Sequence, residues 1–126
     1  EFNLRTGTPA RSFAGGGAPH QIAVSPDGNE LYSANENGFV QFWDLNTGQQ
    51  IGSNLWLPTG AYELAGRPSN GLLYVTSGGY VYVVDPVSRT QINYALAGGL
   101  TRQIAFTADG SIGIVANENG WVVFIK

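Results

Sequence analysis

Few side chains in this sequence could do covalent chemistry. The chain has no Cys, a single His at position 20 and a single Lys at its last position, Lys126. A thiolate nucleophile, a Cys-based metal site and a Schiff-base lysine therefore have no candidate. A lone His also shows no partner for Ser/His/Asp catalysis. No catalytic residue is predicted, and a binding protein is favoured over an enzyme.

The polar residues that could bind a ligand recur about 41 positions apart. One set could line a channel and hold a cation or a polar ligand, although channel positions are often polar only because water reaches them. This set is Gln21, Glu63 and Gln103. The residue before each of them differs in chemistry, and such divergence is where a repeat protein would specialise a site. These residues are His20, Tyr62 and Arg102.

A second feature with possible ligand atoms is the sequence Asn-Glu-Asn-Gly, at 35–38 and again at 117–120. Asn is a neutral ligand, and the several carboxylates and the distal Glu of a calcium-binding EF-hand are absent. Because Asn and Gly serve left-handed turn positions, we expect both segments to be turns. Four of their residues still complete the candidate set for ligand binding, namely Asn35, Glu36, Asn117 and Glu118.

All of these positions follow from an internal repeat of about 41 residues. The segment 34–40 recurs at 116–122, an offset of 82, and a third copy lies halfway between them. In the first copy, strands are predicted over 22–24, 31–34, 38–43 and 49–55, because short apolar runs end at Gly, Asn or Pro turns. No stretch keeps a 3.6-residue apolar period, so essentially no helix is expected. Four strands in about 40–45 residues are typical of a propeller blade.

The sequence over 19–32, Pro-His-Gln-Ile-Ala-Val-Ser-Pro-Asp-Gly-Asn-Glu-Leu-Tyr, resembles the repeat of the YVTN family of β-propellers, and Leu-Tyr-Val-Thr at 73–76 is similar to the tetrapeptide that names the family. The segment 42–48, Phe-Trp-Asp-Leu-Asn-Thr-Gly, is similar to the third strand and turn of WD40 repeats. The Gly-His dipeptide of WD40 repeats is missing, so their His-centred network is not expected. The YVTN resemblance implies a binding module and slightly favours a periplasmic or extracellular location.

Composition restricts the partners of the chain. With 126 residues we expect one domain over 1–126. The net charge of −3 argues against nucleic acid, which needs a basic surface. No apolar run is long enough for a membrane helix, so no membrane association is expected. The remaining partners are a second copy of the chain, another protein or a small polar ligand.

The fold class predicted is all-β, a propeller segment of three four-stranded blades, in which Trp43 and Trp121 pack within blades. The blade formed by 103–126 has three strands, and an outer strand over 4–13 would complement it. Three blades do not close a ring, whereas propellers typically have 4–8 blades. Two copies joined head to tail would give a six-bladed homodimer. A fragment of a larger propeller protein is the alternative.

Two functions compete for this fold. The first is a non-catalytic ligand- or protein-binding module. The second is a metal-dependent hydrolase, by analogy with six-bladed lactonase-type propellers, in which Glu63 with Asn35, Asn117 or Glu118 would hold a divalent cation at the axis. Hard cations prefer about six oxygen ligands and several carboxylates, so only weak cation binding is expected and no other cofactor is predicted.

Overall fold

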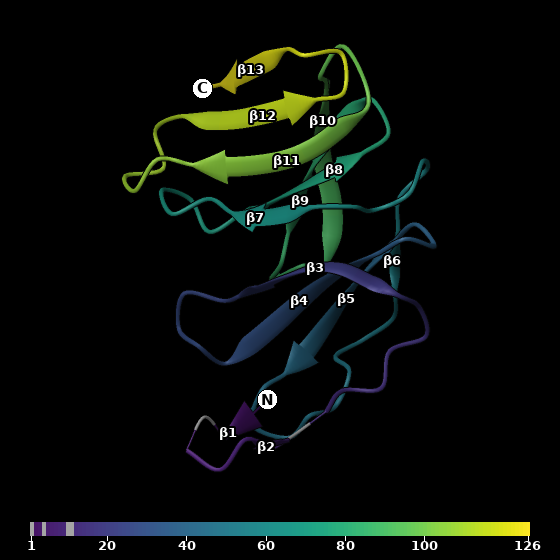
Figure 1. Ribbon diagram of the computed structural model, residues 1–126, viewed down its shortest axis with the longest axis vertical. Helices are drawn as coiled ribbons and strands as arrows, with labels where there is room; N and C mark the ends of the chain where they lie inside the picture. The colour runs from purple at the N-terminus through teal and green to yellow at the C-terminus, as the bar shows by residue number, and fades with distance from the viewer. Residues whose placement is uncertain (1, 4, 10–11) are drawn as a thin grey trace.

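Short runs of β-branched and aromatic residues, each ended by a turn, account for all the regular structure of the chain (Figure 1). The computed structural model describes residues 2–3, 5–9 and 12–126, and over these residues it contains thirteen strands and no helix. Consequently the described residues include no helix that could cross a membrane. The prediction of an all-β protein is confirmed.

The strands form antiparallel sheets in which each strand pairs with its neighbour in sequence. The first sheet consists of β3 (Pro19–Val24), β4 (Glu30–Asn35), β5 (Phe39–Asp44) and β6 (Leu55–Trp56). The second consists of β7 (Leu64–Gly66), β8 (Leu73–Ser77), β9 (Tyr80–Asp85) and β10 (Thr90–Leu96). The third consists of β11 (Thr101–Phe106), β12 (Gly113–Asn117) and β13 (Val122–Ile125). A hairpin of β1 (Phe2–Asn3) and β2 (Thr8–Pro9) precedes them.

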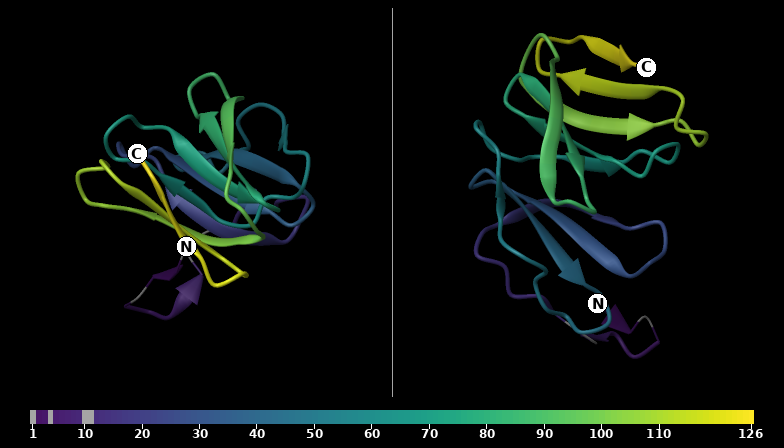
Figure 2. Two further views of the ribbon diagram at one scale, coloured as in Figure 1. Left: turned by 90° about the horizontal axis from the view of Figure 1, so that it is seen from above. Right: turned by 180° about the vertical axis from the view of Figure 1, so that it is seen from behind.

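The three sheets stack face to face in chain order along the longest axis of the molecule, with the hairpin at one end and the third sheet at the other (Figures 1 and 2). The stack is open, and no closed ring of sheets is present among the described residues. The chain therefore presents one sheet that is covered on both faces and two that are covered on one.

The sequence repeat is also a repeat of strand register. Gln21 pairs with Ala34 in the first sheet, and 82 positions later Gln103 pairs with Ala116 in the third. A β-bulge precedes the pair in both sheets. The β1–β2 hairpin follows the 41-residue offset, because its pair Phe2–Pro9 corresponds to the bridge between Trp43 and Gln50.

The turns that join the first two strands of the first and third sheets use the same side-chain bonds. Ser25 Oγ donates to the carboxylate of Asp27 at 2.6 Å, and Thr107 Oγ1 donates to Asp109 at 2.6 Å. The backbone amide two residues after each Asp also donates to it. These bonds favour the charged form, so the pKa of each Asp is lowered from 3.8 to about 2.

The predicted outer strands differ from the observed ones. Over 49–55 only the bridge at Gln50 and the first residue of β6 lie in the ladder. Gly52 has a φ of 69°, and the amide of Gln41 donates to the side chains of Gln50 and Asn54, both at 3.1 Å. Side-chain hydrogen bonds therefore replace the regular ladder in this segment.

The predicted outer strand over 4–13 falls partly on residues 4, 10 and 11, which lie outside the described residues. Its described part contains β2, which pairs with β1, and β13 has no fourth-strand partner among the described residues. The third sheet thus has three strands, β11, β12 and β13.

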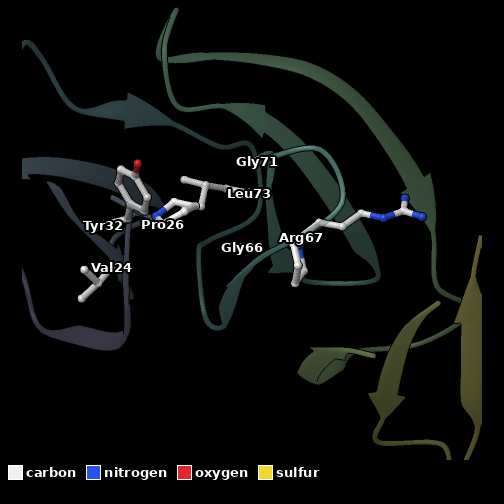
Figure 3. A pocket seen from close by; sticks show the side chains of 8 residues that line it. Val24, Pro26, Tyr32, Gly66, Arg67, Gly71 and Leu73 are labelled. Atoms are coloured by element: carbon white, nitrogen blue, oxygen red, sulfur yellow. The ribbon is translucent and has the colours of Figure 1, made fainter. Parts of the chain in front are cut away.

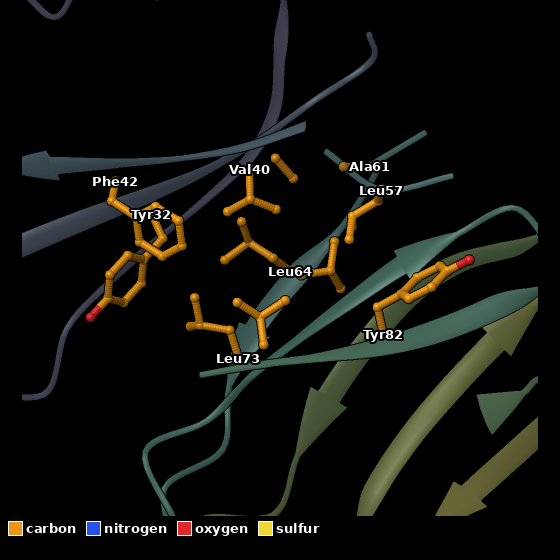
Figure 4. Close-up of a cluster of buried hydrophobic side chains, with 11 residues drawn as sticks. Tyr32, Val40, Phe42, Leu57, Ala61, Leu64, Leu73 and Tyr82 are labelled. Atoms are coloured by element: carbon orange, nitrogen blue, oxygen red, sulfur yellow. The ribbon is translucent and has the colours of Figure 1, made fainter. Parts of the chain in front are cut away.

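Apolar side chains fill the space between the sheets (Figure 4). Between the first and second sheets, Phe42 and Val40 are fully buried and pack with Leu64 and Leu73. A smaller cluster between the second and third sheets contains Tyr74, Val81, Ile104 and Val115. Burying a side chain of this size contributes about 1.5–3 kcal/mol. Docking of one sheet on the next is therefore the main source of stability.

Arg67 joins the second and third sheets on the face of the molecule that carries the turns between the first and second strands of each sheet. Its Nε donates to the carbonyl of Gly110 at 2.7 Å, and its guanidinium lies 5.8 Å from the ring centre of Tyr74 and 5.7 Å from that of Phe106. Ser69 Oγ also donates to the Gly110 carbonyl, at 2.9 Å. The contact requires a residue without a side chain at 110.

We predict that Gly110→Ala destabilises the protein more than Gly28→Ala. The two glycines hold the same turn position, with φ of 68° and 75°. A Cβ at 110 would lie 2.5 Å from the backbone nitrogen of Ser69, whereas a Cβ at 28 meets nothing within 4 Å. Both changes cost roughly 1–2 kcal/mol for a left-handed Ala, and overpacking adds about 1–3 kcal/mol at 110. Urea unfolding of both variants measures the difference, and equal losses would contradict the prediction.

Candidate functional site

The first strand of each sheet lies next to the first strand of the neighbouring sheet, β3 against β7 and β7 against β11, and we call these three the inner strands. His20 and Arg102 hold equivalent positions in β3 and β11, and Tyr62 lies two residues before Leu64, the β7 residue that corresponds to Ile22 and Ile104. His20 and Tyr62 are in contact, with ring centres 5.7 Å apart in an edge-to-face arrangement. We refer to these three residues as the inner row.

The β-bulges of β3 and β11 fall at His20 and Arg102. Each side chain meets a carboxylate on the loop after the next strand. His20 Nε2 lies 3.5 Å from Glu36, and Arg102 Nε donates to Glu118 at 2.6 Å while its Nη2 contacts the same oxygen. Both carboxylates are exposed.

The loops that carry these carboxylates are fixed by matching backbone bonds. The amide of Glu36 donates to the carbonyl of Ala18 at 3.2 Å, and the amide of Glu118 donates to Leu100 at 2.9 Å. In each case the acceptor lies just before the inner strand. The segment before each inner strand and the following loop therefore share one face of the molecule, as expected from the sequence.

The residues after the inner row differ in exposure. Gln21 and Glu63 are half-buried, whereas Gln103 is exposed. Burial raises the pKa of Glu63 above its usual value of 4.5, and the charge of His20 acts in the opposite direction. Glu63 thus adds a carboxylate beside His20 and Tyr62.

Asn35 and Asn117, which the sequence offered as ligands, are instead committed to the turns. Asn35 is 1% exposed, and its amide donates to the carbonyl of Ser33 at 3.2 Å. The amide of Asn117 donates to the carbonyl of Ala97 at 3.0 Å, and its Oδ1 accepts from the amide of Trp121. The expected turns are present, since Gly38 donates back to Asn35. The two Asn side chains therefore hold the loops that carry Glu36 and Glu118.

The described residues, with 1, 4 and 10–11 set aside, contain no group of three or more His, Asp or Glu side chains that could hold a metal ion. Of the residues proposed to hold a divalent cation, Glu118 contacts Arg102, and the side-chain amides of Asn35 and Asn117 donate to backbone carbonyls.

A separate pocket lies between the first and second sheets, on the face of the molecule that carries the turns between their first and second strands (Figure 3). It has a volume of about 310 Å³ and is bordered by Val24, Pro26, Tyr32 and Leu73. The side chain of Arg67 points away from it, toward the third sheet (Figure 3). The sequence analysis did not identify this pocket, because apolar and turn residues there show no pattern distinct from core packing.

The fold and inner row define an all-β protein of stacked antiparallel meander sheets. No protein-family model and no curated protein matches the chain. Among solved structures, a chain of Kuenenia stuttgartiensis hydrazine synthase is similar, with a TM-score of 0.89 at 21% sequence identity. The match covers 99% of this chain and 38% of that chain, so this chain spans well under half of its length. The likeness shows the fold alone.

We predict that Glu63→Gln raises the melting temperature at pH 7. Burial raises the pKa of Glu63, so its ionised form destabilises the folded state, and this cost disappears as the pH falls below about 4.5. The gain should therefore shrink between pH 7 and pH 4. Circular dichroism melts at both pH values measure it.

The matched control is Glu36→Gln, which changes an exposed carboxylate beside the same His20. It should give no comparable gain at pH 7. A melting temperature for Glu63→Gln at or below that of the unchanged protein at pH 7 would contradict the prediction.

Proposed function

We propose that the chain is a segment of a YVTN-type β-propeller with three blades and that it is a non-catalytic binding module. Three observations support the propeller assignment: the sheets stack face to face, each strand pairs with its neighbour in sequence, and the innermost strands lie side by side. The shared register at an offset of 82 supports repeating blades. The third sheet is a blade with three strands.

The observation that carries the binding function is the inner row. Two of its polar side chains, His20 and Arg102, lie on β3 and β11, and Tyr62 lies just before β7; the backbone around His20 and Arg102 is the same, including the bulge. His20 and Arg102 are exposed and Tyr62 is half-buried, so the hydrophobic clusters do not require them. Exposed side chains that differ in chemistry on the same repeated backbone indicate ligand recognition and not packing.

The charge of the inner row, together with the three carboxylates beside it, indicates the ligand. Glu36, Glu63 and Glu118 carry negative charge, and Arg102 balances one of them when His20 is neutral. The net charge of about −2 attracts a cation, and the ring of Tyr62 can accept one over its face. We therefore infer a ligand with an amine or guanidinium group, either a small molecule or a basic side chain of another protein.

The test is an NMR titration of the ¹⁵N-labelled chain with N-acetyl-lysine amide and N-acetyl-arginine amide, with acetate as the probe of opposite charge. The cationic probes should shift the backbone amides of His20, Tyr62 and Glu63 and saturate at millimolar concentration. Acetate should not. Glu63→Gln should weaken binding about tenfold, because one carboxylate is lost beside the cation.

A matched control is Tyr94→Ala, which removes a 58% exposed tyrosine on β10, against Tyr62→Ala in the row. Only the change at 62 should weaken binding. The proposal fails if the cationic probes leave all three amides unshifted, or if acetate alone shifts them.

A further inference from the structure

The outward face of the third sheet is apolar and exposed. Ile114, Val122 and Phe124 project from β12 and β13 with 36%, 56% and 64% of their surfaces exposed. They lie on one face, since Ile114 pairs with Phe124 and Val122 pairs with Ala116. A face of this kind ordinarily lies against another element.

The same face of the first sheet is buried. The residues 82 positions earlier are Tyr32, Val40 and Phe42, with exposures of 4%, 0% and 0%. In the first sheet they pack on β7, β8 and β9 of the second sheet (Figure 4). The exposed face of the third sheet therefore repeats an interface that the chain already forms once internally.

At the opposite end of the stack, the outward face of the first sheet is also partly uncovered. Ile22 on β3 is 56% exposed, whereas its equivalents Leu64 and Ile104 are 2% and 7% exposed because a preceding sheet covers them. Trp43, on the outer part of the same sheet, is covered by Phe13, with ring centres 5.9 Å apart. The open part of this face is the inner-strand side.

The first sheet also makes a backbone hydrogen bond of the kind found where one sheet packs on the sheet before it. The bond from the Glu36 amide to Ala18 matches the bond from the Glu118 amide to Leu100, which lies where the second and third sheets meet. In addition, the β1–β2 hairpin, with the register of a third-to-fourth strand hairpin, lies beyond the first sheet at this end of the stack (Figure 1).

We propose that the outward face of the third sheet binds the outward face of the first sheet of a second copy, and that two copies joined in this way form a ring of six sheets. One chain carries both halves of the interface, so a second copy is the occupant that continues the interfaces already present. Two identical head-to-tail contacts close with twofold symmetry, and six sheets lie within the usual range for propellers.

The ring also extends the inner row. Because β11 of one copy would lie next to β3 of the other, Arg102 would neighbour the partner's His20, as Tyr62 neighbours His20 within one chain. The row would then be continuous around the axis. The dimer rests on sheet packing and not on ligand binding, so its failure would leave the binding function to be judged by the NMR titration.

The test is the mass of the 126-residue chain in solution by light scattering after size exclusion. A value near twice 13.4 kDa is expected. Phe124→Glu and Ile22→Glu place a charge in opposite halves of the interface, and each should raise the dimer dissociation constant about a hundredfold or more. Leu96→Glu is the control, since Leu96 is 73% exposed on β10 and belongs to neither face.

A mixture of the two variants distinguishes a head-to-tail ring from a dimer in which two third sheets pair with each other. In a head-to-tail ring, a chain with Phe124→Glu and a chain with Ile22→Glu share one unaltered interface, so the mixture should recover part of the dimer. Circular dichroism establishes that each variant is folded, and the mass of the unchanged chain tests the proposal without any variant. A monomer near 13.4 kDa would overturn it. A dimer that resists Ile22→Glu would also overturn it, since the third sheets would then pair with each other.

Discussion

The packing of one sheet face on the next is the interaction on which the rest of this protein depends. A meander of four short strands satisfies its own backbone hydrogen bonds but cannot cover its apolar faces. Leu64 and Phe42 are buried only because the first and second sheets meet, and Ile104 only because the third sheet meets the second. The same contact sets the spacing of the inner strands and thereby brings His20 against Tyr62.

The inner row shows how a repeat can vary chemistry at constant geometry. The bulges in β3 and β11 interrupt the regular alternation of side chains at His20 and Arg102. The turn after the next strand supplies the carboxylate that each of them contacts, Glu36 or Glu118. Packing and turn hydrogen bonds fix this frame, so the residue at the bulge is free to be His or Arg. In the middle copy the loop has Gly78 where the others have Glu, and Tyr62 has no facing carboxylate of this kind.

The repeat, the turns and the strand order were predictable because they depend on local residue types: the offset of 82 and the Asp27 and Asp109 turns both follow from the printed sequence. Other features depend on neighbours that residue types do not specify. Trp121 was expected to pack within a blade, yet it is 69% exposed, because no fourth strand among the described residues covers it as Trp56 covers Phe39. The bulge has no residue signature, and the sequence predicted the turn at Asn35 but not the hydrogen bonds that engage its side chain.

Pairing of each strand with its chain neighbour has a consequence for the unfolding of the molecule. Most contacts within a sheet join residues close in sequence, so a sheet can form or open as a local unit, and only docking joins distant residues. The second sheet is covered on both sides, whereas the others are covered on one. Backbone amides should therefore exchange with solvent in a graded order, from the two ends of the stack inward, with β8 and β9 the last to open.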